Sequence, residues 1–80
     1  MLTEQIKELI TNGLPDSQVY VETDGYHYKV TVVSAQFEGL NRVKRSQAVY
    51  ACIGHLINDG TLHSVPMETY TPEEWQSKQG

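Results

Sequence analysis

The sequence contains a single cysteine, Cys52, among its 80 residues. One cysteine excludes an internal disulfide and any metal centre built only from cysteines of this chain, and this sparing use is typical of proteins in a reducing cytoplasm. The sequence also lacks an apolar run near the roughly 20 residues of a membrane span, and its N-terminal segment does not resemble a signal or transit peptide. We therefore expect a cytoplasmic protein without a membrane partner, in which any metal site uses histidine or borrows ligands.

Positive charge is scarce as well. The 6 Lys and Arg residues stand against 10 Asp and Glu, so the formal net charge is -4. This charge opposes tight binding to nucleic acid, because contacts with phosphates supply most of the affinity that does not depend on sequence. Three of the basic residues nevertheless fall close together: Arg42, Lys44 and Arg45. This basic corner is either the solvated first turn of a helix or a surface that binds a partner.

The common catalytic motifs are also missing. The sequence has no GxGxxG, P-loop, GxSxG or HExxH pattern, and nothing in it pairs Cys52 with a base. Cys52 is most simply interpreted as a small buried apolar residue, and His55 as a partly exposed helical histidine. The alternative for this pair is half of a metal site. The missing motifs therefore remove most enzyme classes.

Hydrophobic residues make up 39% of the sequence and charged residues 20%, a balance typical of a folded domain. A chain of this length forms one small core, so residues 1–80 are interpreted as a single domain. Apolar residues at helical spacing predict an amphipathic helix over residues 3–12, ended by a glycine and a proline. Asp24-Gly25 between two alternating segments predicts a β-hairpin. The side chains expected to face the core from its strands are Val19, Val21, Tyr28, Val30 and Val32.

In the segment that follows the hairpin, the apolar residues recur at helical spacing. A helix is expected from about residue 41 to 58, with Asn41 as its N-cap and Asp59-Gly60 at its end. The positions that mark its buried stripe are Val43, Ala48, Val49, Tyr50, Ile53, Leu56 and Ile57.

After this helix, "TLHSVPMETY" indicates a final strand. His63 and Val65 fall on one side of it. Because Pro66 cannot donate a ladder hydrogen bond, the strand either lies at a sheet edge or is irregular at that residue. The capping box that begins at Thr71 predicts a terminal helical turn. Trp75, in that turn, is expected to fold back over the core.

The predicted order is helix, strand, strand, helix, strand and a short helical turn. This order indicates an α+β fold with a three-stranded sheet and helices packed on one face. Type II KH-like domains have the same order. KH domains that bind RNA hold its backbone with a GxxG loop. The corresponding loop here, "FEGLN", has one glycine, which argues against RNA binding of the KH type.

His27 and His63 are the residues best placed for chemistry. Each is predicted at the start of a strand, where loops and exposed surface are usual. Two neutral imidazoles would supply half of a tetrahedral metal site, and the other half would come from another molecule. The alternative for His63, which shares a side with Val65, is a half-buried histidine hydrogen-bonded to the backbone. Periodicity does not show whether the two rings converge.

Three segments, "DGYHYKV", "FEGLNRVKRSQAVY" and "LHSVPMETYTPEEW", resemble the BolA family over nearly the whole chain, and most of all its IbaG-like branch of small bacterial proteins. The resemblance implies the α-β-β-α-β fold reached above. It also implies that the histidine matching His63 is a ligand of a [2Fe-2S] cluster shared with a monothiol CGFS glutaredoxin and glutathione. His27 matches a more variable hairpin-loop position that is a proposed second ligand. Pro66 and Cys52 lie outside the family pattern.

The function implied by the resemblance is that of a non-catalytic adaptor. It would bind the glutaredoxin and act in iron-sulfur cluster trafficking, iron homeostasis and the response to acid or general stress. No cluster is expected in the isolated chain, which we expect to be a monomer. A second hypothesis is a DNA-binding transcriptional regulator of the BolA type, in which Arg42, Lys44 and Arg45 meet phosphate at a helix N-terminus. A third is a stress-response role without an assigned partner.

Overall fold

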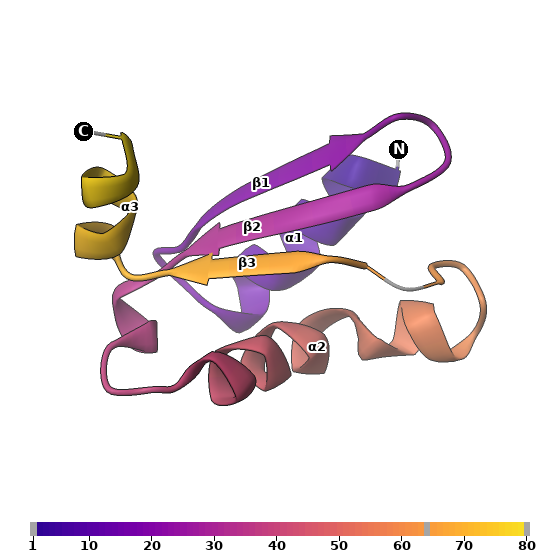
Figure 1. The fold of residues 1–80 in the computed structure, drawn as a ribbon. Helices are drawn as coiled ribbons and strands as arrows, with labels where there is room; N and C mark the ends of the chain where they lie inside the picture. Colours follow the sequence, from indigo (N-terminus) through magenta and orange to yellow (C-terminus); the bar gives the residue numbers. More distant parts are fainter. Residues whose placement is uncertain (1, 64, 80) are drawn as a thin grey trace.

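The computed structural model describes residues 2–63 and 65–79. The elements in chain order are α1 (Leu2–Gly13), β1 (Gln18–Thr23), β2 (Tyr28–Val33), the 3-10 turn η1 (Ala35–Phe37), α2 (Arg42–Asn58), β3 (Met67–Tyr70) and α3 (Pro72–Gln79) (Figure 1). The predicted α+β order with a C-terminal helical segment is therefore confirmed. In the described part of the chain, no helix has the length and apolar character needed to cross a membrane.

The three strands form one mixed sheet in the order β1-β2-β3. β1 and β2 are an antiparallel hairpin in which Val21 lies opposite Val30. β2 and β3 run parallel, because α2 carries the chain back before β3 begins. Helices α1 and α2 cover one face of the sheet, and α3 stands at the end where β1 begins and β3 ends (Figure 1). The hairpin loop therefore lies at the opposite end of the molecule from α3.

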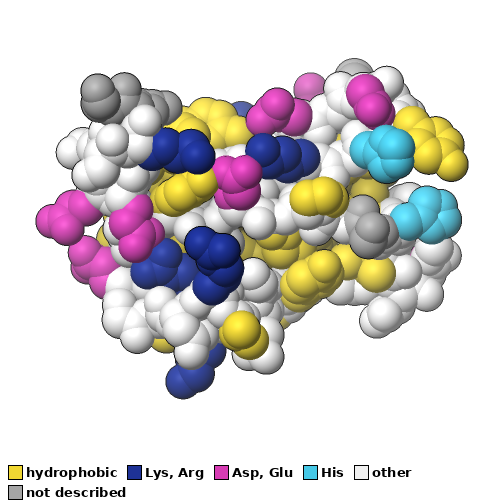
Figure 2. All heavy atoms as spheres, viewed as in Figure 1, with side chains coloured by type: hydrophobic (Ala, Val, Ile, Leu, Met, Phe, Trp, Pro, Cys, Tyr) yellow, Lys and Arg dark blue, Asp and Glu magenta, His cyan; other side chains and the backbone are white. Residues whose placement is uncertain are grey.

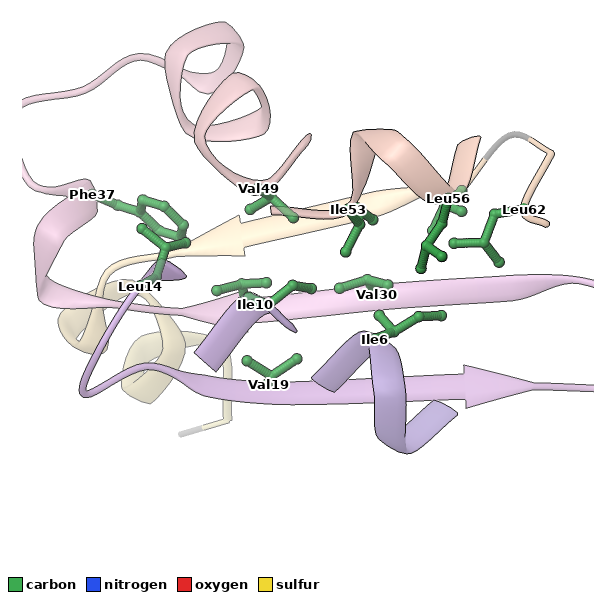
Figure 3. Close-up of a cluster of buried hydrophobic side chains, with 12 residues drawn as sticks. Ile6, Ile10, Leu14, Val19, Val30, Phe37, Val49, Ile53, Leu56 and Leu62 are labelled. Carbon is green, nitrogen blue, oxygen red and sulfur yellow. The ribbon is translucent and has the colours of Figure 1, made fainter. Parts of the chain in front are cut away.

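The core lies between the sheet and helices α1 and α2 (Figure 3). Its buried side chains are Ile6, Ile10, Leu14, Val19, Val30, Val32, Phe37, Val49, Ile53, Leu56, Leu62 and Val65. Of the side chains predicted to face the core from the hairpin strands, Val19, Val30 and Val32 belong to this cluster, and Val21 and Tyr28 are partly buried against it. Strand alternation thus placed the sheet residues on the correct face.

The predicted stripe of α2 is partly wrong. Val43 is 64% exposed and Tyr50 is 40% exposed, whereas Val49, Ile53 and Leu56 are buried. At about 100° of rotation per residue, Val43 and Tyr50 point roughly 100° away from the centre of the buried stripe. The apolar pattern was wider than the face that the sheet and α1 actually cover.

The predicted caps are confirmed. The Asn41 side chain accepts a hydrogen bond from the Lys44 N–H at 2.9 Å, which caps α2. At α3 the capping box is reciprocal. Thr71 N–H donates to the Glu74 carboxylate at 2.8 Å, and Glu74 N–H donates to the Thr71 hydroxyl at 3.2 Å.

The final strand is shorter than the sequence predicts. β3 begins at Met67, and the described residues between Thr61 and Pro66 form a loop; Ser64 lies outside the described residues. Leu62 and Val65 are both buried, a spacing of three that breaks strand alternation. The Leu62 N–H also donates to the Leu56 carbonyl at 2.9 Å, which holds the loop against the end of α2.

Trp75 does not cover the core as expected. Its ring stacks on Tyr20 with 5.5 Å between centroids and lies 5.4 Å from Tyr70. Tyr20 follows buried Val19 in β1, so it projects from the face opposite to α1 and α2. α3 therefore adds an aromatic side chain to the outer face of the sheet.

Candidate metal-ligating site at the hairpin end

His27 lies in the hairpin loop, directly before β2, rather than within the strand. Its side chain is 76% exposed, and its ring meets the Tyr26 ring edge to face with 4.8 Å between centroids. The Nδ1 atom lies 3.5 Å from the Asp24 carboxylate. A carboxylate at Nδ1 favours the tautomer that leaves Nε2 free to bind a metal.

Asp24 shapes the loop that carries His27. Its Oδ1 atom accepts hydrogen bonds from the N–H groups of His27 at 2.7 Å and Tyr26 at 2.9 Å. These bonds, with a smaller contribution from the His27 ring, lower the pKa of Asp24 from 3.8 to about 2. The carboxylate is therefore ionised at physiological pH, and it fixes both the backbone and the ring of His27.

His63 lies in the loop between α2 and β3, four residues before the strand that the sequence predicts it to open. Its side chain is exposed, so the alternative of a half-buried, hydrogen-bonded histidine is wrong. Its neighbours Leu62 and Val65 are buried in the core. Buried residues on both sides hold the backbone of this loop while the imidazole faces solvent.

The structure brings the two histidines together. Both line one hollow of about 260 Å³, with Tyr26, Tyr28 and Thr61 among its other lining residues. Figure 2 shows two histidine side chains close to each other at one end of the molecule, where Figure 1 places the hairpin loop. Two loops whose histidines are 36 positions apart in the sequence thus supply one imidazole each to the same surface.

This site is incomplete as a metal centre by itself. Among the described residues, no three histidine, cysteine or carboxylate side chains are grouped closely enough to hold a metal ion. Two accessible imidazoles can each give a neutral nitrogen ligand to iron, zinc or copper. Any metal held here needs its remaining ligands from another molecule.

Only part of the basic corner formed by Arg42, Lys44 and Arg45 is available to bind another molecule. Arg45 is 14% exposed and its Nη1 atom lies 2.7 Å from the Glu74 carboxylate, while its Nε donates to the Leu40 carbonyl at 2.9 Å. Its guanidinium therefore ties α2 to α3. Within the described chain, neither Arg42 nor Lys44 takes part in an ion pair, and both are exposed. Two exposed cations, Arg42 and Lys44, therefore remain for contact with a partner, rather than the three that the sequence indicates.

Cys52 and His55 do not form a metal site with any third ligand in the part of the chain that the structure describes. Cys52 is half-buried against the core, and burial raises the pKa of its thiol. His55 is exposed in the last turn of α2. These positions match the simpler interpretations made from the sequence.

Sequence reasoning missed the role of Asp24. The residue was recognised as part of a turn, but not as the partner of the His27 ring. An aspartate three residues before a histidine in a hairpin loop is the signal that could have revealed it, since Asp side chains commonly bind backbone N–H groups two or three residues later.

Comparison with known proteins identifies the family. The sequence pattern of the BolA-like protein family matches residues 9–74. This chain belongs to the BolA family. It is 37% identical over 75 residues to the acid stress protein IbaG of Escherichia coli K12, covering 94% of this chain and 89% of that protein.

Solved BolA structures have the same fold. A BolA protein homologue from Coxiella burnetii superposes with a TM-score of 0.77 at 35% identity, over 92% of this chain and 95% of that one. A more limited similarity, 33% identity over 52 residues, relates the chain to the Haemophilus influenzae protein named DNA-binding transcriptional regulator BolA. That match covers 65% of this chain and 50% of the other protein.

Proposed function

We propose that this BolA-family protein is a non-catalytic adaptor that binds a monothiol CGFS glutaredoxin and shares a bridging [2Fe-2S] cluster with it. The cluster is cargo: the glutaredoxin cysteine and glutathione supply the sulfur ligands, and His63 and His27 supply nitrogen ligands. The role would lie in cluster trafficking and iron homeostasis during acid or general stress. The similarity to a protein named for acid stress supports that setting.

One observation carries the proposal. Two exposed imidazoles from different loops line a single hollow, and the described chain offers no third ligand beside them. A pair of this kind suits a cluster whose other ligands come from a partner, because a cluster held within one chain needs a complete ligand set.

The chemistry of the ligands explains what such an adaptor would change. Replacing thiolates by neutral imidazoles makes a [2Fe-2S] site less negative and raises its reduction potential, as in Rieske centres. Imidazole also loses its metal when it is protonated, because a nitrogen ligand must be neutral to bind. The adaptor would therefore make the shared cluster responsive to acid through His63 and His27.

The test is reconstitution of the mixed complex. The purified protein is combined with a CGFS glutaredoxin, glutathione, iron and sulfide, and visible absorption and circular dichroism are recorded. We expect a spectrum that differs from that of the glutaredoxin alone. His63→Ala should abolish the difference, and His27→Ala should weaken or reshape it, because each removes one nitrogen ligand.

His55→Ala is the matched control. His55 is exposed in the last turn of α2 and does not line the hollow, so its removal should leave the spectrum unchanged. Far-ultraviolet circular dichroism checks that all three variants fold. If His63→Ala forms the same mixed complex as the unaltered protein, the ligand assignment fails and the proposal with it.

The similarity to a protein named as a DNA-binding regulator supports a second candidate function. Arg42 and Lys44 are exposed at the N-terminal end of α2, where backbone N–H groups and basic side chains favour phosphate. The net charge of -4 weighs against this function, as does the use of Arg45 in an ion pair.

A further inference from the structure

The outer edge of β1 is open. In the described part of the chain β1 pairs with β2 alone, and Figure 1 shows it as the outermost strand, with α1 behind the sheet. The Val30 N–H donates to the Pro66 carbonyl at 3.0 Å, on the β3 side. Val30 and its partner Val21 are therefore a non-hydrogen-bonded pair, and Val21 directs its N–H and C=O outward. By alternation, Val19 does the same.

β1 has few of the features that usually protect an edge strand, and Glu22 is its one charged side chain. Natural edges are kept short or carry lysine, proline or a bulge, which prevent pairing with other chains. β1 has six residues, pairs with β2 without a bulge, and contains neither lysine nor proline. β3, the other edge, has four residues and lies between Pro66 and Pro72. β1 is thus the edge that can accept another strand.

Two hollows lie beside this edge. One of about 540 Å³ is lined by Glu4 and Lys7 of α1, by Tyr20 and Glu22 of β1, and by Trp75. A second, of about 370 Å³, shares Tyr20 and Trp75 with the first. The stacked aromatic pair therefore separates two spaces along the strand, and both are available to the side chains of an added segment.

The charged residues that line the two hollows indicate which kind of segment could bind there. Glu4 and Glu22 line the first hollow and Asp16 lines the second, while Lys7 is the one cation among the described residues that line the two hollows. The faces of Tyr20 and Trp75 attract cations as well. A second copy of this chain fits poorly, because β1 has no lysine or arginine to offer these carboxylates.

We propose that the open edge of β1 binds an extended, basic segment of a partner protein, which joins the sheet as a fourth strand. Its backbone would pair with the outward N–H and C=O groups of Val19 and Val21. Its lysine or arginine side chains would lie against Trp75 and Glu22. The hollows that carry this inference are lined by neither His27 nor His63, so it stands apart from the cluster function.

Trp75 provides the measurement, since it is the only tryptophan in the chain. The probe is a six-residue peptide of alternating lysine and valine, acetylated and amidated at its ends. We expect saturable quenching or enhancement of Trp75 fluorescence, with shifts of the Val19 and Val21 amide signals in a nitrogen-proton NMR spectrum. The same peptide with glutamate in place of lysine should bind at least about tenfold more weakly, because close charge pairs contribute that much at interfaces.

Two further peptides test the backbone pairing. Each carries N-methyl groups on every second backbone nitrogen, one on the lysines and the other on the valines. Alternate N–H groups of a strand point to opposite edges, so one peptide should lose binding and the other should keep it. Equal binding by both, or no binding of the unmethylated peptide at millimolar concentration, overturns the proposal.

Variants of the protein complete the test. Val21→Pro removes an outward N–H that the β1-β2 ladder does not use, and Glu22→Lys reverses the charge beside the edge; both should weaken binding of the basic peptide about tenfold or more. Glu38→Lys makes the same charge change at an exposed residue outside the hollows and should have little effect. A concentration-dependent dimer that Val21→Pro abolishes would instead show that β1 pairs with its own copy, and would overturn the partner proposal.

Discussion

Asp24 is the residue on which the geometry of the candidate site depends most directly. Its carboxylate accepts two backbone N–H groups of the loop and lies beside the His27 ring. The pKa of Asp24 is lowered from 3.8 to about 2, first by the His27 N–H and next by the Tyr26 N–H. Because the folded state lowers this pKa, the stabilisation by the charge is complete above about pH 4 and is lost as the pH falls through about 2.

This order of causes gives a prediction for His27→Ala. The variant removes the imidazole but keeps the backbone N–H, so the pKa of Asp24 should stay well below 3.8. The measurement is a carbon NMR titration of the Asp24 carboxyl group from pH 6 to 1.5, with the unaltered protein as reference. A return of the pKa to its ordinary value would show that the ring, and not the backbone, holds the carboxylate.

At the scale of elements, α3 is held by a few polar contacts more than by the core. The Oε1 atom of Glu74 accepts hydrogen bonds from the Thr71 N–H and from Arg45 Nη1. One carboxylate oxygen therefore caps α3 and joins it to α2, and these bonds lower the pKa of Glu74. Trp75 adds its stacking on Tyr20.

Removing the cap should therefore weaken the docking of α3. We expect Thr71→Ala to lower the free energy of unfolding by about 1 kcal/mol, because the Glu74 N–H loses the side chain that caps it. Urea denaturation followed by Trp75 fluorescence measures this change. Ser77→Ala, at an exposed position of the same helix, is the control and should change stability by less than about 0.5 kcal/mol.

The elements also show which features a sequence reveals. Caps and the hairpin were predictable, because Asn41, Thr71 and Asp24-Gly25 act through neighbours in the chain. The start of β3 was not predictable. Leu62 is buried in the core from a loop, without pairing as part of a strand, and its position there depends on where α2 ends in space. The meeting of His27 with His63 was unpredictable for the same reason, since periodicity does not relate two loops to each other.

At the scale of the whole molecule, the candidate surfaces are separate. Histidine side chains lie at one end in Figure 2, and the Lys and Arg side chains of this view lie over its middle and the other end. The hollow that His27 and His63 line contains neither Arg42 nor Lys44. Cluster sharing and DNA binding, if both occur, would therefore use different surfaces and respond to different substitutions.

This separation decides how the DNA-binding candidate is tested. With Arg45 paired to Glu74, about two cations remain for phosphate, so the logarithm of the affinity should fall with the logarithm of salt concentration with a slope near -2. The double variant Arg42→Ala, Lys44→Ala should abolish the binding, measured by fluorescence anisotropy of labelled duplex DNA, yet leave the spectrum of the glutaredoxin complex unchanged. Binding that survives this variant would exclude the α2 corner as the DNA surface. Loss of the cluster spectrum in the same variant would show that the glutaredoxin reaches across from the histidines to this corner, and the two surfaces would then have to be treated as one.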